Sequence, residues 1–240
     1  MLQNAHKSEV EKGDVSFALV DSRSNPAWHS FANKVFDSDS GDVSISEIMS
    51  GANLSNWNVR LEDVAPAFPN HNFITDSYLV VRDNPMTAGE TDVLSVVGSR
   101  YKVVQNEELF SFAENLHDGN PNVKVDSAGS LKNGRVVYGS WNLPNELILD
   151  PNGANDKTSL YLIVWTSHDG SVAVQAAITP VRVRCQNTLN FAMKRAKQSF
   201  KIRHTTTADG KILAAREALG LSVAYFDEFS KEAATLFKRE

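Results

Sequence analysis

Seven basic side chains fall in one stretch of the sequence that lacks acidic residues. Between Ser171 and Ala208 there is no Asp or Glu, although the whole chain has 29 acidic residues, 24 basic residues and a formal net charge of −5. Positive charge concentrated in this way inside an acidic chain indicates an anionic partner. The seven residues are Arg182, Arg184, Lys194, Arg195, Lys197, Lys201 and Arg203.

The first two of these residues have the spacing of a strand. Arg182 and Arg184 alternate with Val181 and Val183, which predicts one face carrying two guanidinium groups and another facing the core. Side chains two residues apart on a strand lie about 7 Å apart, which suits contact with successive phosphates. We therefore expect this strand to begin an anion-binding surface.

The next basic residues have the spacing of a helix. Lys194 and Lys197 are three residues apart, Lys201 follows one turn later, and Arg195 lies to the side. The alternative interpretation is a solvated helix face whose charge is balanced elsewhere in the chain. Suitable acidic residues occur near the C-terminus, at Glu217, Asp227, Glu228 and Glu232.

A second candidate site is polar rather than basic. Histidine titrates near neutral pH and a thiol is activated at a helix N-terminus, so these residue types could support acid–base or nucleophilic chemistry. The simpler interpretation is a polar hairpin turn followed by a small buried cysteine. The candidate residues are His168, Asp169, Cys185, Asn187 and His204.

The motifs of common cofactor and metal sites are absent from the sequence. There is no G-x-G-x-x-G, no P-loop, no H-E-x-x-H, no C-x-x-C, no EF-hand loop and no G-x-S-x-G. We therefore expect no cofactor and no metal, and we assign no catalytic residue.

Both candidate sites depend on a predicted hairpin. Apolar strand-like runs at 160–165 and 171–178 flank Asp169-Gly170, a dipeptide that favours a type I′ turn. A helix is expected to start near Asn187 or Thr188. The aromatic residues of the strands could stack on bases, although core packing explains most of them.

The remaining patterns predict an α+β fold. Strands are expected at 57–61, 78–82, 93–104, 123–131 and 135–143, the last two joined by a turn at Asn133-Gly134. Helices are expected at 27–36, 45–54, 106–116 and 209–237. The expected architecture is an antiparallel sheet built of hairpins, with helices packed on one face and a long C-terminal helix.

The chain divides into three predicted regions. Residues 1–25 are polar and are expected to be a flexible N-terminal arm, residues 26–207 an α+β core domain, and residues 208–240 a C-terminal helical segment. No apolar stretch approaches the roughly 20 residues of a membrane span. One cysteine fits a reducing compartment, so the cytoplasm is the expected location.

Several segments together resemble a known family. They are Trp28-His29, Val97–Phe110, Ala128–Leu131 with Gly134-Arg135, Ser167–Ser171, Val181–Leu189 and Ile202–Thr205. In this order they resemble the phage/plasmid-like protein family built on domain of unknown function 932, over about residues 25–225. Ser30 departs from the family pattern, which usually has Gly at this position. The resemblance implies origin in a mobile element, whereas the activity of the family is not settled.

The expected order of elements is also similar, at the level of fold, to the core of RecT- and Redβ-type single-strand annealing proteins. We therefore expect a homo-oligomeric phage or plasmid protein of DNA metabolism that binds single-stranded DNA or anneals it. Two alternatives remain: an enzyme or small-ligand protein using the polar site, and a phage factor that binds a host protein to counter defence.

Overall fold

The structure is a computed structural model that describes most of the chain up to residue 202. The described residues are 15–21, 32–64, 70, 76–116, 121–148, 157–183, 186–195 and 199–202. Within these ranges, no helix is long and apolar enough to cross a membrane.

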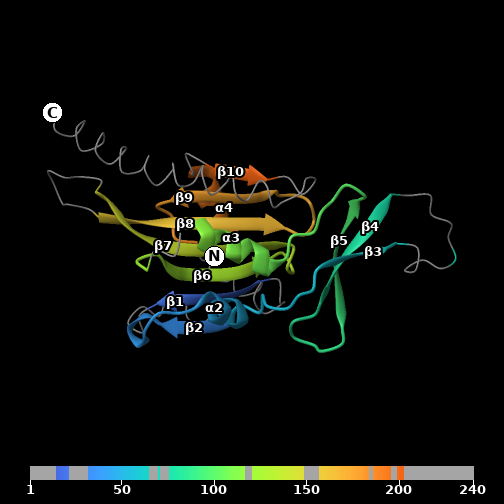
Figure 1. The fold of residues 1–240 in the computed structure, drawn as a ribbon, viewed down its shortest axis with the longest axis horizontal. Coiled ribbons are helices and arrows are strands. Elements are labelled where there is room, and N and C mark those ends of the chain that lie inside the picture. Colours follow the sequence, from blue (N-terminus) through green and yellow to red (C-terminus); the bar gives the residue numbers. More distant parts are fainter. Residues whose placement is uncertain are drawn as a thin grey trace, which may run out of the picture.

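A seven-stranded sheet forms the body of the protein (Figure 1). All neighbouring strands are antiparallel except the pair at one edge, β1 and β2, which run parallel. In spatial order the strands are β10 (Ser199–Ile202), β9 (Val174–Thr179), β8 (Lys157–Ser167), β7 (Val136–Ile148), β6 (Lys124–Leu131), β1 (Ser16–Asp21) and β2 (Lys34–Asp37).

A three-stranded antiparallel sheet lies at one end of the large sheet (Figure 1). Its strands, in spatial order, are β3 (Arg60–Asp63), β4 (Ser77–Asp83) and β5 (Thr91–Gly98). The described helices are α2 (Ile45–Gly51), α3 (Asn106–Leu116), α4 (Gln186–Arg195) and the short 3-10 helix η2 (Ser38–Ser40). The α+β class is therefore confirmed.

Helices cover both faces of the large sheet. Leu162 and Ile163 are neighbours in β8 but belong to different hydrophobic clusters, because successive strand residues point to opposite faces. The cluster with Leu162 includes residues of α2 and α3, whereas the cluster with Ile163 includes Leu189 and Ala192 of α4. The prediction that the helices pack on one face is therefore wrong. Strands that are apolar on both sides require cover on both sides.

The two predicted hairpins of the large sheet are confirmed, with different turns. Between β6 and β7, Lys132, Asn133 and Gly134 all have positive φ. Strands β8 and β9 also pair, but residues 168–173 separate them and only Gly170 has positive φ there. The Asp169-Gly170 turn is therefore not the two-residue type I′ turn expected.

The N-terminal region contains the main errors of the sequence analysis. Residues 16–21 are strand β1, inserted between β6 and β2, and Phe17 and Leu19 are fully buried. This part of the predicted flexible arm is thus a central strand. The expected helix at 27–36 is wrong at residues 34–36, which belong to strand β2 and pair with β1.

Other elements match in kind and differ in their ends. Helix α3 has the predicted bounds, and α2 begins at a capping box in which the Ser44 side chain accepts from the Glu47 amide. Strand β3 starts at Arg60 rather than Trp57, since Asn56 and Asn58 have positive φ. Strand β5 stops at Gly98 rather than at residue 104. The predicted long helix at 209–237 lies outside the described residues.

Candidate functional site

Arg182 is part of a partly buried ion-pair cluster. Its Nε donates to Asp126 Oδ1 at 2.7 Å, and one terminal nitrogen donates to the carbonyl oxygen of Val20 at 2.8 Å. Asp21 lies 3.7 Å from the other terminal nitrogen. Burial alone would lower the pKa of Arg182, but the hydrogen bond and charge of Asp126 raise it. Two carboxylates and a carbonyl therefore already bind this guanidinium.

A bulge in β6 places the carboxylate partner of Arg182. The register between β6 and β7 shifts between Val125 and Ser127, so Asp126 is the extra residue. The side chain of Asp126 is only 6% exposed and needs a cation nearby. Ser127 Oγ donates to the carbonyl oxygen of Val183 at 2.8 Å, which fixes the same segment to β6.

The predicted strand carrying Arg182 and Arg184 is wrong over its described part. Strand β9 ends at Thr179, and residues 180–183 have no regular secondary structure. Arg184 lies outside the described residues. The side-by-side arrangement of two guanidinium groups expected from alternation therefore has no strand to support it.

Helix α4 packs on one face of the large sheet, and Lys201 of the edge strand β10 belongs to that same face. Phe200 packs with the cluster on the α2 and α3 side, so its neighbour Lys201 belongs to the opposite face. That is the face on which Leu189 and Ala192 of α4 are buried. Both elements contact β9, because α4 packs against it and β10 pairs with it.

Lys201 differs from Arg182 in its surroundings. It is exposed and makes no ion pair with any residue in the described part of the chain. Lys194 and Arg195 belong to α4, although their side chains are not described. Lys197 and Arg203 lie outside the described residues. Lys194 and Arg195 thus belong to the helix that packs on the face of the sheet where Lys201 lies. Arg182 differs from Lys201 because it is bound to two carboxylates.

Phe191 is an exposed aromatic residue that the sequence analysis missed. It lies in α4 and is 47% exposed, an unusual degree for a large apolar side chain. The signal was present in the sequence, because Phe191 falls off the helical stripe formed by Leu189 and Ala192.

His168 is buried in the core and is inaccessible to a ligand. It is fully buried, and its Nε2 lies 3.0 Å from Asn106 Oδ1. Because the Asn106 amide nitrogen donates to the Leu54 carbonyl at 2.8 Å, its oxygen accepts and His168 Nε2 donates. The backbone of His168 also accepts from Ser95 Oγ and donates to the carbonyl of Arg135. His168 thus joins the end of β8 to α3 and to the small sheet.

Of the other members of the predicted polar site, only the Asp169 side chain is described, and it has a separate role from that of His168. Asp169 is the next residue along the chain, but its carboxylate accepts from the Ser171 amide at 2.8 Å and caps the turn. Cys185 and His204 lie outside the described residues, and Asn187 belongs to α4 with its side chain not described. No group of three or more metal-ligating side chains occurs among residues the structure describes.

Asp169 instead lines a cleft between the β8–β9 loop and the end of β5. The cleft has a volume of about 750 Å³ and includes Tyr101 and Arg100 in its wall. Burial would raise the pKa of Asp169, but hydrogen bonds from Ser171 and Ser167 lower it below its usual value. Burial raises the pKa of Tyr101, and the charge of Asp169 adds to this effect. At neutral pH the cleft therefore carries an ionised Asp169 beside a neutral phenol.

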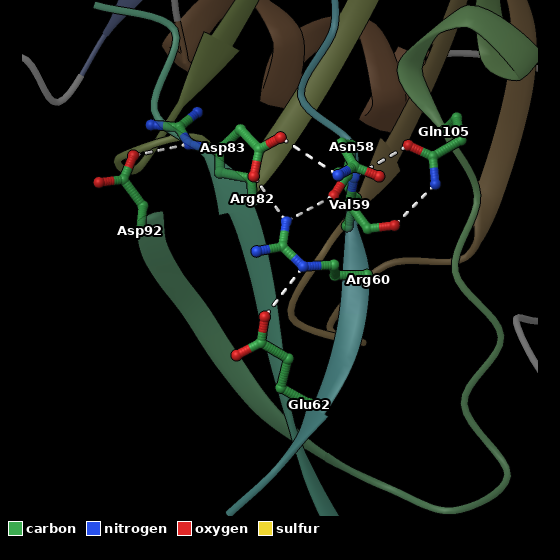
Figure 2. A network of polar contacts seen from close by, with 8 residues as sticks. All are labelled: Asn58, Val59, Arg60, Glu62, Arg82, Asp83, Asp92 and Gln105. Atoms are coloured by element: carbon green, nitrogen blue, oxygen red, sulfur yellow. Dashed lines mark hydrogen bonds and ion pairs between the residues drawn. The ribbon is translucent and has the colours of Figure 1, made fainter. Parts of the chain in front are cut away.

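A polar network holds the small sheet in place (Figure 2). Arg60 lies between two carboxylates, with Nη1 2.6 Å from Asp83 and Nε 2.9 Å from Glu62. Gln105 exchanges hydrogen bonds with the backbone of Val59 through both its amide oxygen and its nitrogen. The contacts of Arg60 with Asp83 and of Gln105 with Val59 connect residues more than twenty positions apart, and no local pattern signals them.

Arg82 connects this network to the core. Its Nε donates to Asp92 at 2.8 Å, and its guanidinium carbon lies 4.0 Å from the ring centroid of Trp57. The Trp57 ring is in turn 5.7 Å from the ring of His168. The buried His168 ring thus packs against Trp57, whose indole is covered by the Arg82 guanidinium.

Comparison with known proteins identifies a family and no individual relative. The family model described as a domain of unknown function (DUF932) matches residues 93–240, more than half of the 240-residue chain. No curated protein and no solved structure matches the chain. The matched region includes all but the first two residues of β5, strands β6 to β10, the polar hairpin and the carboxylate-free stretch. The chain therefore belongs to the DUF932 family, the domain of unknown function that its sequence resembles.

Proposed function

We propose that this protein binds single-stranded DNA along the face of the large sheet that carries α4 and β10. The observation that supports the proposal most directly is Lys201, an exposed cation without a carboxylate partner among the described residues. It belongs to the same face as α4, which includes Lys194 and Arg195. Exposed cations without acidic neighbours are what a phosphate backbone requires.

Phe191 favours a single strand over a duplex as the ligand. An aromatic side chain on a basic surface can stack on an unpaired base, and stacking is tolerant of sequence. Bases inside a duplex are already stacked and do not offer their faces. The exposed Phe191 therefore supplies a reason to expect single-strand binding that charge alone does not provide.

Arg182 is left out of the proposed contact surface. A guanidinium bound to Asp126 and Asp21 would have to break its ion pairs before it contacted a phosphate. The contact set then comprises Arg184, Lys194, Arg195, Lys197, Lys201 and Arg203. We further propose that the protein is a phage or plasmid factor acting in the host cytoplasm, in DNA metabolism such as strand annealing.

Variants of α4 and β10 test the proposal. Fluorescence anisotropy with a labelled oligothymidine at about 50 mM salt should give binding, and Lys194→Ala/Arg195→Ala/Lys201→Ala should weaken it at least tenfold. The matched control is Lys124→Ala, which removes an exposed cation from β6. Phe191→Ala should weaken binding roughly fivefold or more while leaving the salt dependence unchanged, because stacking releases no counterions. Absence of binding by the unmodified chain, or equal binding by the triple variant, would refute the proposal.

A further inference from the structure

An ionised carboxylate lies in the cleft between the β8–β9 loop and the end of β5. Asp169 is partly buried there, and its hydrogen bonds with Ser171 and Ser167 keep it ionised despite this burial. These donors are neutral, and no cation in the described part of the chain lies within ion-pair distance of Asp169. A partly buried charge without a counterion favours a ligand that supplies N–H donors.

The same cleft has a guanidinium in its wall. Arg100 follows β5, is exposed and makes no ion pair with a residue that the structure describes. A second cation, Lys132 of the β6–β7 turn, lies near enough for its positive charge to favour the ionised form of Asp169. Asp76, the other carboxylate of the lining, is exposed and therefore hydrated. An acceptor for N–H groups and a donor for an anion thus occur in one cleft.

The rest of the wall includes apolar and aromatic side chains. Val96 and Val97 come from β5, and Tyr101 is only 8% exposed. Gly170 has no side chain to cover them, whereas a Cβ at that position would lie 3.8 Å from the Tyr101 ring and 4.0 Å from Val97. The cleft volume of about 750 Å³ is in the range of small-ligand sites. A flat ring that has N–H groups at one edge and is attached to an anion matches this wall.

The cleft adjoins the proposed DNA surface. Ala173 in its wall immediately precedes β9, and Lys201 of β10 pairs with Gln175, two residues further along the chain. Two residues of a strand span about 7 Å. A DNA strand whose phosphate contacts Lys201 can therefore place a neighbouring base in the cleft.

We propose that this cleft binds one unpaired nucleotide and selects guanine, an inference that rests on the proposed function. An ionised carboxylate only accepts hydrogen bonds, and the Watson–Crick edge of guanine presents two neighbouring N–H donors to Asp169. Adenine and cytosine present one amino group each, whereas the single N–H of thymine is flanked by two carbonyl oxygens that the carboxylate repels. Arg100 then contacts the phosphate of the same nucleotide.

Titration of the full chain with dGMP and with dTMP, followed by amide NMR spectra, tests the cleft without DNA. Binding of dGMP should saturate and shift the amide resonances of Gly98 and Gly170, with a Kd about fivefold or more below that of dTMP. Asp169→Asn keeps an oxygen that caps the turn, and it should abolish this preference. Glu90→Gln is the control, because it removes an exposed carboxylate at the opposite end of β5. Absence of saturable dGMP binding, equal affinity for the two nucleotides, or an unchanged preference in Asp169→Asn would overturn the proposal.

Oligonucleotides separate this inference from the proposed function. An oligothymidine with one central guanine should bind about threefold or more tightly than oligothymidine alone, and Asp169→Asn should remove the difference. Equal binding of the two oligonucleotides would reject guanine selection and leave the proposed DNA surface intact. Binding of dGMP without binding of either oligonucleotide would retain the nucleotide site and reject the DNA surface.

Discussion

Residues of the same type in one stretch of sequence have different roles in this protein. Arg182 and Lys201 both belong to the carboxylate-free window, but Arg182 is paired with Asp126 and Asp21 whereas Lys201 is exposed. Both partners of Arg182 come from strands more than fifty residues earlier in the chain. Local charge counting therefore finds basic residues without telling which of them are available to a ligand.

Replacing Arg182 should affect stability more than binding. Arg182→Ala leaves the 6% exposed Asp126 without its cation, which should lower the free energy of unfolding by about 2–4 kcal/mol. Urea denaturation followed by circular dichroism measures this. Lys124→Ala, which breaks an exposed ion pair with Asp42, should cost below about 1 kcal/mol. If the Arg182→Ala protein were fully stable but had lost affinity for DNA, Arg182 would be a DNA contact rather than a structural residue.

At the scale of elements, hairpin turns lock the two sheets together. The β6–β7 turn approaches the small sheet so closely that a Cβ on Gly134 would lie 3.0 Å from Trp57 and would collide with the Arg82 guanidinium. The β8–β9 loop also contacts the small sheet, because the carbonyl oxygen of His168 accepts a hydrogen bond from Ser95 Oγ of β5. Both turns were predicted from dipeptides, but their contacts with the second sheet were not.

Comparing Gly134 with Gly89 separates the cost of backbone strain from the cost of a steric clash. Gly134 and Gly89 have nearly equal φ values of 82° and 83°, but a Cβ on Gly89 would meet nothing within 4 Å. Gly89→Ala should therefore cost about 1 kcal/mol, from strain alone. Gly134→Ala should cost about 2–3 kcal/mol, since it also displaces Arg82 from Trp57. Thermal and urea denaturation of both variants measures the difference, and equal losses would mean that the stack contributes little.

At the scale of the whole molecule, charge is divided between regions. The seven basic residues of the window belong to a chain of net charge −5, so the remaining chain carries −12. Negative charge on the rest of the chain would discourage general coating of nucleic acid and would confine a polyanion to the proposed surface of α4 and β10. Affinity for DNA should accordingly arise from a limited number of phosphate contacts.

The slope of the salt dependence of binding should report the number of phosphate contacts. For single strands, the logarithm of the binding constant falls with the logarithm of salt concentration by about 0.7 per phosphate contact, so the six proposed contacts give a slope near −4. Titrations between about 50 and 200 mM salt measure the slope. The triple variant of α4 and β10 should reduce its magnitude by about 2, and Lys124→Ala should not change it. A slope near zero for the unmodified chain would exclude phosphate contacts.

Local sequence patterns identified much of the fold and little of the candidate site. The β4–β5, β6–β7 and β8–β9 hairpins and helices α2, α3 and α4 were predicted, because alternation, caps and turn dipeptides act over a few neighbouring residues. Strand β1 was missed since a short segment, Ser16–Asp21, inside a polar region carries a weak local signal and is stabilised by β6 and β2. The sequence analysis named His168 as a candidate site residue, but it could not predict that Trp57 and Asn106, from other elements, bury it.

By itself the sequence determined the α+β class, the family and a stretch of positive charge without carboxylates, because composition and short-range pattern are properties of neighbouring residues. Only the tertiary structure decided that Arg182 is already neutralised and that Lys201 belongs to the face of the sheet on which α4 packs. Those outcomes depend on residues such as Asp126 and Arg182, or Ser95 and His168, that are distant in the chain and adjacent in space.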